Sequence, residues 1–381
     1  MAVADYELIK SVPDSTAEVP ASGAGLRVVD AAPVLTNEVL LGAVNGHEQA
    51  GGAIVQLVTE ANVEELLLAQ DLEARFAPEH LSALTDEFLE KGTNVNLKEL
   101  AGDRKYVVGI IPATSAYADV ARSVEVMKFA KVFKRSWTDV YQDYAPYDEA
   151  STFLAVIDVQ GDKPMPVGAM RFIEPGHEIP LKSVHDLVVD DPANPWIDEI
   201  KTNYFDADEP YDAVTAWDRL CQRAGIDLNL AETMDVATIA SLKVNGKRSE
   251  LRAISLALYH SCVHYAKAQG AKNLVSIQDL APFRLLQGYG DPFDTFEGLE
   301  PHPYGGPDDT VPAFCNIDEG IRRIRNKDAF TGHVFADGFG LTKEYLFFDE
   351  YDPARYSNEA IGYQSLAEIE AAFKALAASS S

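Results

Sequence analysis

Apolar residues recur at helical spacing along the segment between residues 26 and 103, whereas they form short β-branched runs further on. The segments VEELLLAQDLEARF and PEHLSALTDEFLEKG both follow the helical pattern. Pro78 is the first residue of the second segment and Gly92 is its last, and these residue types mark helix ends. We therefore expect a helical N-terminal region over 26–103, preceded by a flexible arm over 1–25 that is rich in Ala, Ser, Pro and acidic residues.

From residue 104 onward the pattern alternates between strands and helices. The order is β-α-β-β-(insert)-β-α-β-α-β, with a hairpin around the sequence GDKP and an insert over 176–232 that carries one helix near AVTAWDRLCQRAG. The expected strands are 104–112, 152–160, 166–175, 235–244, 272–279 and 310–318, and the expected helices are 117–137, 249–269 and 280–290. This order predicts an α/β (α+β) fold with a mixed, mostly antiparallel sheet flanked by helices. The domain is expected to span 104–330, with a C-terminal extension over 331–381 that ends in a helix.

Composition narrows the classes of function. The chain has 32 Lys and Arg against 60 Asp and Glu, a net charge of −28, which argues against a nucleic-acid partner because phosphate binding needs a basic face. It has no apolar stretch long enough to span a membrane, and its start lacks the features of a secretory signal. Its three cysteines are widely spaced and odd in number, which favours a reducing, cytoplasmic location without disulfides or a metal site.

The basic stretch SLKVNGKRSELR stands out on this acidic chain. It lies between the predicted strand 235–244 and the predicted helix 249–269, and a helix start offers unpaired N–H groups and a positive dipole end. Gly246 allows close approach of the backbone, and the neighbouring cations can contact phosphate. We interpret it as a phosphate-binding turn, although a solvated helix start explains the same charges. Its residues are Lys243, Val244, Asn245, Gly246, Lys247, Arg248 and Ser249.

The order strand, glycine turn, helix, strand, short helix resembles the Gcn5-related N-acetyltransferase (GNAT) superfamily. In that superfamily a loop of the pattern Q/R-x-x-G-x-G/A binds the pyrophosphate of CoA or the phosphate of a phosphopantetheine arm. Lys243 and Gly246 match the first basic position and the first glycine, whereas Arg248 replaces the second small residue. The resemblance implies an acyl thioester, of CoA or of an acyl carrier protein, as co-substrate, with no permanently bound cofactor.

A narrower resemblance covers about residues 105–320. The segment VFKRSWTDVYQDYAPYDEASTFLAVID, followed by PVGAMRFIEPG, is similar to acyl-homoserine-lactone synthases and N-acyl amino acid synthases. The residues that match the family motifs are Phe133, Trp137, Asp148 and Arg171. The family's Trp-Glu-x-Ser-Arg falls on residues 234–238, where Asp235 keeps the acid but Thr238 replaces the arginine, and Ala145 stands where a further acid is expected.

This resemblance implies roles for individual residues in the transfer of an acyl group from a thioester to the amine of a small, amino-acid-like acceptor. Asp235 and Glu232 are the candidates for the general base, and Tyr289 is the candidate for the group that protonates the leaving thiolate. Trp137, Asp148 and Arg171 are the candidates for acceptor binding, although Asp148 and Arg171 also suit an ion pair with each other. Backbone N–H groups near 242–244, where the strand would diverge from its neighbour, would bind the oxyanion.

Other interpretations of the same residues stay open. The changes at Arg248 and Thr238 also suit a non-catalytic protein that binds an acyl thioester or a lipid as a sensor, and the helical N-terminal region suits a scaffold. Lys128, Lys131, Lys134 and Arg135 recur along one predicted helix, where a solvated face explains them and a docking patch for an acidic acyl carrier protein is the alternative. His260 and His264 lie one helical turn apart, but no third ligand is evident, so we expect no metal site.

Overall fold

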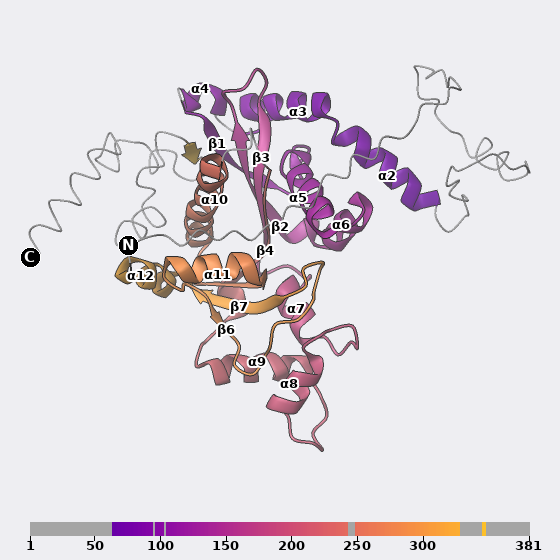
Figure 1. Cartoon of the computed structure of the whole chain (residues 1–381), viewed down its shortest axis with the longest axis vertical. Coiled ribbons are helices and arrows are strands. Elements are labelled where there is room, and N and C mark those ends of the chain that lie inside the picture. The colour runs from indigo at the N-terminus through magenta and orange to yellow at the C-terminus, as the bar shows by residue number, and fades with distance from the viewer. Residues whose placement is uncertain (1–62, 94–95, 103, 243–247, 328–344, 348–381) are drawn as a thin grey trace, which may run out of the picture. The chain divides into compact units, whose positions relative to one another are not determined.

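A single sheet of eight strands organises the part of the chain that the structure describes, in the order β6-β7-β5-β4-β3-β2-β1-β8 (Figure 1). The structure is a computed structural model that describes residues 63–93, 96–102, 104–242, 248–327 and 345–347. The strands are β1 (Tyr106–Pro112), β2 (Ser151–Asp158), β3 (Met165–Ile173), β4 (Thr233–Ser241), β5 (Asn273–Asp279), β6 (Asp294–Thr295), β7 (Thr310–Asn316) and β8 (Tyr345–Phe347). Neighbouring strands are antiparallel except for the pairs β4–β5 and β1–β8, so the predicted mixed, mostly antiparallel sheet is confirmed.

Helices cover both faces of this sheet (Figure 1). The α-helices are α2 (Val63–Arg75), α3 (Pro78–Lys91), α4 (Leu97–Ala101), α5 (Ala118–Phe133), α6 (Trp137–Tyr144), α7 (Lys182–Val188), α8 (Ile197–Tyr204), α9 (Ala213–Ala224), α10 (Arg248–Ala268), α11 (Leu280–Tyr289) and α12 (Ile317–Lys327). Short 3-10 helices, η1 (Ala145–Ala150) and η2 (Leu230–Glu232), precede β2 and β4.

The alternation of side chains along each strand decides which helices share a face. On β3, Ala169 packs with α5 whereas its neighbour Met170 packs with α10, so α5 and α10 lie on opposite faces. On β7, Phe314 packs with α7–α9 and its neighbour Cys315 packs with α10. Helices α11 and α12 join α10, because Leu286 and Ile324 pack with residues of that helix.

The N-terminal helices pack directly on the sheet domain. Phe88 and Leu97, from α3 and α4, share an apolar cluster with Val107 of β1 and Phe153 of β2. Helix α2 joins the adjoining cluster, where its residue Leu72 packs with α5 and α6. The described part of the predicted helical region thus shares its core with the sheet. The predicted arm over 1–25 and most of the predicted extension over 331–381 lie outside the described residues.

The structure corrects three element predictions. The helix expected over 117–137 is two helices, because Lys134 takes a left-handed conformation (φ 55°) that ends α5, and Ser136 and Asp139 form a capping box that starts α6. The insert holds three α-helices rather than one, since α7 and α8 have only seven and eight residues and are too short to show a clear periodicity. Helix α12 was not predicted at all, because it follows β7 without a turn.

The contact between α3 and β1 leaves no room for a side chain at Gly109, which gives a test of the packing of α3 on the sheet. A Cβ atom at this position would lie 2.6 Å from Cε1 of the buried Phe88 ring. We expect Gly109→Ala to lower the free energy of unfolding by about 1–3 kcal/mol, measured by urea denaturation. The control is Gly288→Ala in α11, where an added Cβ atom would meet no atom of another segment within 4 Å. Because alanine also favours the helix, the stability of this variant should stay equal or rise. Equal stability of both variants would contradict the packing described.

Candidate active site

Strands β4 and β5 separate soon after they begin, and this divergence creates the candidate site. They pair in parallel only from Thr233↔Asn273 to Asp235↔Val275. Beyond those pairs β4 continues to Ser241 along β3, and β5 continues to Asp279 along β7. The edges of β4 and β5 that face each other beyond this point are therefore not paired with one another. The expected divergence is present, but it starts after Asp235 instead of near residues 242–244.

A β-bulge in β4 coincides with the start of the divergence. The register with β3 shifts between Arg171↔Thr238 and Phe172↔Val236, so Ala237 has no partner across the strand pair. A bulge bends its strand and increases the local twist. The bend therefore moves the second half of β4 away from β5 while it stays attached to β3.

A cavity of about 410 Å³ fills the gap between the two strands. Its walls in the sheet are residues 236–241 of β4 and 276–279 of β5. Because it is also lined by α5 and α6 on one face of the sheet and by α10, α11 and α12 on the other, it passes through the sheet. A cavity of this size matches the lower part of the range for small-molecule sites.

The two ends of this cavity differ in chemistry. On the α10 face the lining is mainly apolar, with Tyr259, Val263, Leu286, Phe293, Ile321 and Ile324, although Ser255 of α10 also lines it. On the α5 face it includes polar groups, with Lys128, Arg135, Asp143, Tyr144 and Tyr304. Of the predicted docking patch, Lys128 and Arg135 thus line the cavity, and Arg135 forms an ion pair with Asp143. A molecule that fills the cavity should have an apolar tail and a polar end.

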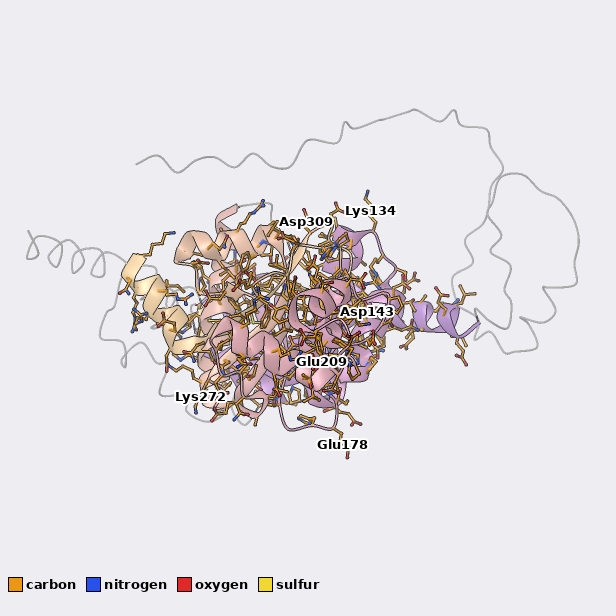
Figure 2. The ribbon with its side chains drawn as sticks, turned by 90° about the horizontal axis from the view of Figure 1, so that it is seen from below. Lys134, Asp143, Glu178, Glu209, Lys272 and Asp309 are labelled. Atoms are coloured by element: carbon orange, nitrogen blue, oxygen red, sulfur yellow. The ribbon has the colours of Figure 1, made fainter. Side chains whose placement is uncertain are left out.

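A loop over residues 302–310, here called the strap, crosses the polar end. It is closed at its base by the backbone pair of His302 and Thr310, and Gly306 packs so tightly on Phe133 that a Cβ atom would lie 2.7 Å from Cβ of that residue. Figure 2 shows Lys134, which follows Phe133 in sequence, and Asp309, which precedes Thr310, at the same edge of the molecule. The strap thus connects the β7 half of the sheet to the end of α5 above the cavity.

Tyr304 anchors the strap in a polar cluster beside the cavity. Its hydroxyl donates to a carboxylate oxygen of Asp186, and Nζ of Lys182 donates to the Tyr304 oxygen at 2.9 Å. The Lys182 ammonium lies 5.5–5.7 Å from the ring centroids of Tyr144, Tyr147 and Tyr304. Burial and the Asp186 charge raise the pKa of Tyr304, so its hydroxyl stays protonated at neutral pH.

Arg171, predicted to bind the acceptor, lies in a buried ion-pair cluster instead of the cavity wall. Its Nε and Nη2 donate to the two carboxylate oxygens of Glu125 at 3.0 and 2.8 Å, and its Nη1 donates to Asp148 at 2.8 Å. The predicted alternative, an ion pair between Arg171 and Asp148, is therefore present. Thr238 donates to Glu125 at 2.5 Å and also lines the cavity. Glu125 was missed from the sequence, although an acid between two valines on a mainly apolar helix is the signal that marks it.

Asp235, predicted as the general base, is fully buried, with an exposed fraction of 0%. The backbone N–H of Ser183 donates to it at 2.6 Å and the Ser183 hydroxyl donates at 2.8 Å. Burial raises the pKa of the carboxyl to about 6, against the lowering effect of the two Ser183 hydrogen bonds. Asp235 is not among the residues that line the cavity. The structure places it behind the wall, at the start of α7.

The remaining predicted site residues whose side chains the structure describes do not themselves line the cavity. Glu232 forms an ion pair with Lys272 at 2.7 Å, and Tyr289 packs with Leu286 and Ile324 at the end of α11. Trp137 packs on Phe76, with ring centroids 5.7 Å apart. The predicted phosphate-binding turn falls on residues 243–247, outside the described residues, and the side chains of Arg248 and Ser249 are likewise outside them.

Among the residues that the structure describes, no helix is long and apolar enough to cross a membrane. No group of three or more His, Cys, Asp or Glu side chains among them is arranged to hold a metal ion. His260 and His264 lie with ring centroids 4.2 Å apart on α10, as their spacing predicts.

No protein-family model matches the chain, and no curated protein matches it. Solved structures do show similarity. The chain is similar to the acyl-homoserine-lactone synthase LasI (10% identity, TM-score 0.34, covering 56% of this chain and 91% of that one). It is also similar to FeeM, an N-acyl amino acid synthase from uncultured soil microbes (13% identity, TM-score 0.34, covering 57% of this chain and 94% of that one). A third similar structure is MesI, a CoA-dependent acyl-homoserine lactone synthase (13% identity, TM-score 0.33, covering 59% of this chain and 95% of that one).

The enzymes that the sequence motifs resemble are thus among the solved structures to which the chain is similar. All three TM-scores are below 0.5 and all three identities are 13% or less.

The raised pKa of Asp235 predicts how stability depends on pH. Between pH 4 and 6 the folded protein keeps a proton on this carboxyl that the unfolded chain releases, so the contribution of Asp235 becomes less favourable as pH rises through that window. Asn at this position carries no charge to bury. We expect the stability of Asp235→Asn relative to the wild type to increase by up to about 3 kcal/mol between pH 4 and 7. Urea denaturation of both proteins across this range measures the difference, and a constant difference would argue against the shift.

Proposed function

We propose that the protein is an N-acyltransferase that moves an acyl group from a thioester, of CoA or of an acyl carrier protein, to the amine of a small, amino-acid-like acceptor. The observation that carries this proposal is the cavity through the sheet between the diverging strands β4 and β5. The resemblance of the sequence motifs to N-acyl amino acid synthases agrees with it.

The unpaired strand edges suit the arm of the donor. A phosphopantetheine arm is extended and carries two amide groups, which can hydrogen-bond to a strand edge as an added peptide strand does. Residues 236–241 of β4 offer such an edge beside the cavity. In this proposal the phosphate end of the donor contacts the turn 243–249, where the chain passes from β4 to α10.

The chemical step needs three functions at the thioester carbonyl. A neutral amine attacks the carbonyl carbon and forms the new carbon–nitrogen bond, the carbonyl oxygen becomes an oxyanion, and a base takes the proton that the nitrogen loses. The oxyanion then collapses to the amide as the carbon–sulfur bond breaks, and the leaving thiolate takes a proton. The backbone around the bulge at Ala237 is the proposed oxyanion site, because it lines the cavity where β4 leaves β5. The predicted base, Asp235 or Glu232, would act through water, since neither lines the cavity.

The polar end of the cavity is the proposed acceptor site. Thr238, Tyr144 and Tyr304 line it, and the Thr238 oxygen, whose proton is donated to Glu125, can still accept a hydrogen bond from the amine of the acceptor. Tyr289 stays a prediction as the proton donor to the thiolate. Tyr259 lines the cavity itself, on the α10 face.

A binding protein without catalysis is the second candidate. It is favoured by the observation that Asp235 and Arg171 are both buried and hydrogen-bonded to protein groups, away from the cavity lining. In this alternative the same cavity holds an acyl thioester or a lipid as a signal, and no thiol is released.

Filling the cavity tests donor binding. Val263 of α10 is partly buried and lines the apolar end, so Val263→Trp should occupy the space that an acyl chain needs. We expect at least about tenfold weaker binding of decanoyl-CoA by calorimetry, with an unchanged circular dichroism spectrum. The matched control is Val214→Trp, on α9 at a position that is 70% exposed and away from the cavity. Equal affinity of folded Val263→Trp and wild type would argue against this donor site.

Turnover separates the two candidates and tests Asp235. The assay follows thiol release from decanoyl-CoA over a panel of amino acids; the protein's own cysteines interfere little, because they are buried and burial raises their thiol pKa values. If Asp235 is the base, Asp235→Asn should lower kcat by about 100-fold or more while decanoyl-CoA binding stays unchanged. Unchanged turnover would remove Asp235 from the mechanism. Donor binding without thiol release in the wild type would favour the sensor.

A further inference from the structure

The lining of the cavity on the α10 face includes a contact between β7 and α12. Cys315, in β7, and Gly320, in α12, both line the cavity, together with Ile317 and Ile321. Cys315 is buried, and its thiol donates to the carbonyl of Asn316 at 3.2 Å. These four residues are here called the floor of the pocket.

Gly320 is placed where a larger residue does not fit. It lies in the interior of α12, where glycine is unfavourable for a helix and no positive φ requires it. A Cβ atom on Gly320 would lie 2.6 Å from Sγ of Cys315 and 3.2 Å from the carbonyl oxygen of Pro292. The absence of a side chain at this position is therefore explained by the space that Cys315 occupies.

The cavity is the empty space beside this contact. Cys315, Gly320 and Pro292 all line it, and the backbone of Pro292 cannot move as easily as a thiol. A methyl group at position 320 would therefore displace Sγ of Cys315 toward the cavity and make it shallower. Removal of the thiol would have the opposite effect.

We propose that the contact between Gly320 and Cys315 sets the depth of the acyl pocket, and thereby the longest straight acyl chain that the protein binds. This inference rests on the proposed function for the identity of the ligand as an acyl thioester. It adds two specificity-determining residues, on elements that none of the sequence motifs includes. The ligand class it implies is an apolar acyl chain, because Ile317, Ile321 and the thiols of Cys262 and Cys315 line this face of the cavity.

A double-mutant cycle tests the proposal. Gly320→Ala, Cys315→Ala and the double variant are compared with the wild type in binding to a series of acyl-CoA thioesters from butyryl to palmitoyl. A methylene group that no longer fits loses about fourfold in affinity, so Gly320→Ala should weaken the longest chains by about tenfold and leave butyryl-CoA unchanged. Cys315→Ala should extend the preference to longer chains. The double variant should return to the wild-type profile, because the methyl group takes the space of the thiol.

The control is Gly288→Ala, the helical glycine of α11 with no atom within 4 Å, which should keep the wild-type profile. Cys315→Ala only removes an atom, so it carries the test if Gly320→Ala does not fold. If affinity depends on acyl chain length in the same way in all folded variants, the proposal is overturned.

Displacement of a fluorescent fatty acid by free fatty acids of the same lengths distinguishes this inference from the proposed function. If fatty acids show the predicted change in profile but no thioester binds, the pocket assignment stands and the acyltransferase proposal fails. If thioesters bind with one profile in all variants, the acyltransferase proposal stands and the role of Gly320 and Cys315 fails.

Discussion

The separation of β4 from β5 is the constraint on which the rest of the site depends. A sheet is stabilised by paired backbone groups, and unpaired groups in its interior are costly unless a ligand or water satisfies them. Here β4 and β5 are no longer paired with each other after Asp235, and the bulge at Ala237 bends β4 so that a gap opens between the two strands. Such an edge is stable in a folded protein when an extended ligand can complete it. The divergence of β4 and β5 is thus a feature expected of a binding site as well as a feature of the fold.

A buried ion-pair cluster holds the divergent strand in place. Arg171 of β3 and Glu125 of α5 pair away from water, Arg171 also pairs with the partly exposed Asp148 of η1, and Thr238 of β4 donates to Glu125. Removing one partner of a buried ion pair typically costs about 3–5 kcal/mol, because the other charge is left uncompensated. The cluster therefore fixes the position of Thr238, a residue of the cavity wall, relative to α5. The ion-pair cluster thus acts on the cavity wall through Thr238, although Arg171 itself does not line the cavity.

The sequence predicted the elements whose periodicity is local and missed what depends on contacts between distant segments. Strands such as β2 and β3 and the long helix α10 lie within a few residues of their predicted bounds. The break between α5 and α6 was missed because Lys134 takes a positive φ, which is unfavourable for lysine and which its residue type does not signal. The partner of Asp235, Ser183, lies 52 residues away on a helix too short to predict. The family resemblance singled out Asp235, but only the fold shows that it is buried behind the cavity wall.

A passage through the sheet, apolar on one face and polar on the other, has consequences for the order of events in the proposed reaction. With its acyl tail among α10, α11 and α12, the donor would place its carbonyl in the gap between the strands. The amine would then approach from the α5 face, under the strap that Tyr304 anchors to Asp186 and Lys182. Because tail and amine use opposite faces, lengthening the acyl chain does not restrict the acceptor. Donor and acceptor specificity can therefore change independently, the first at the floor of the pocket and the second at the strap.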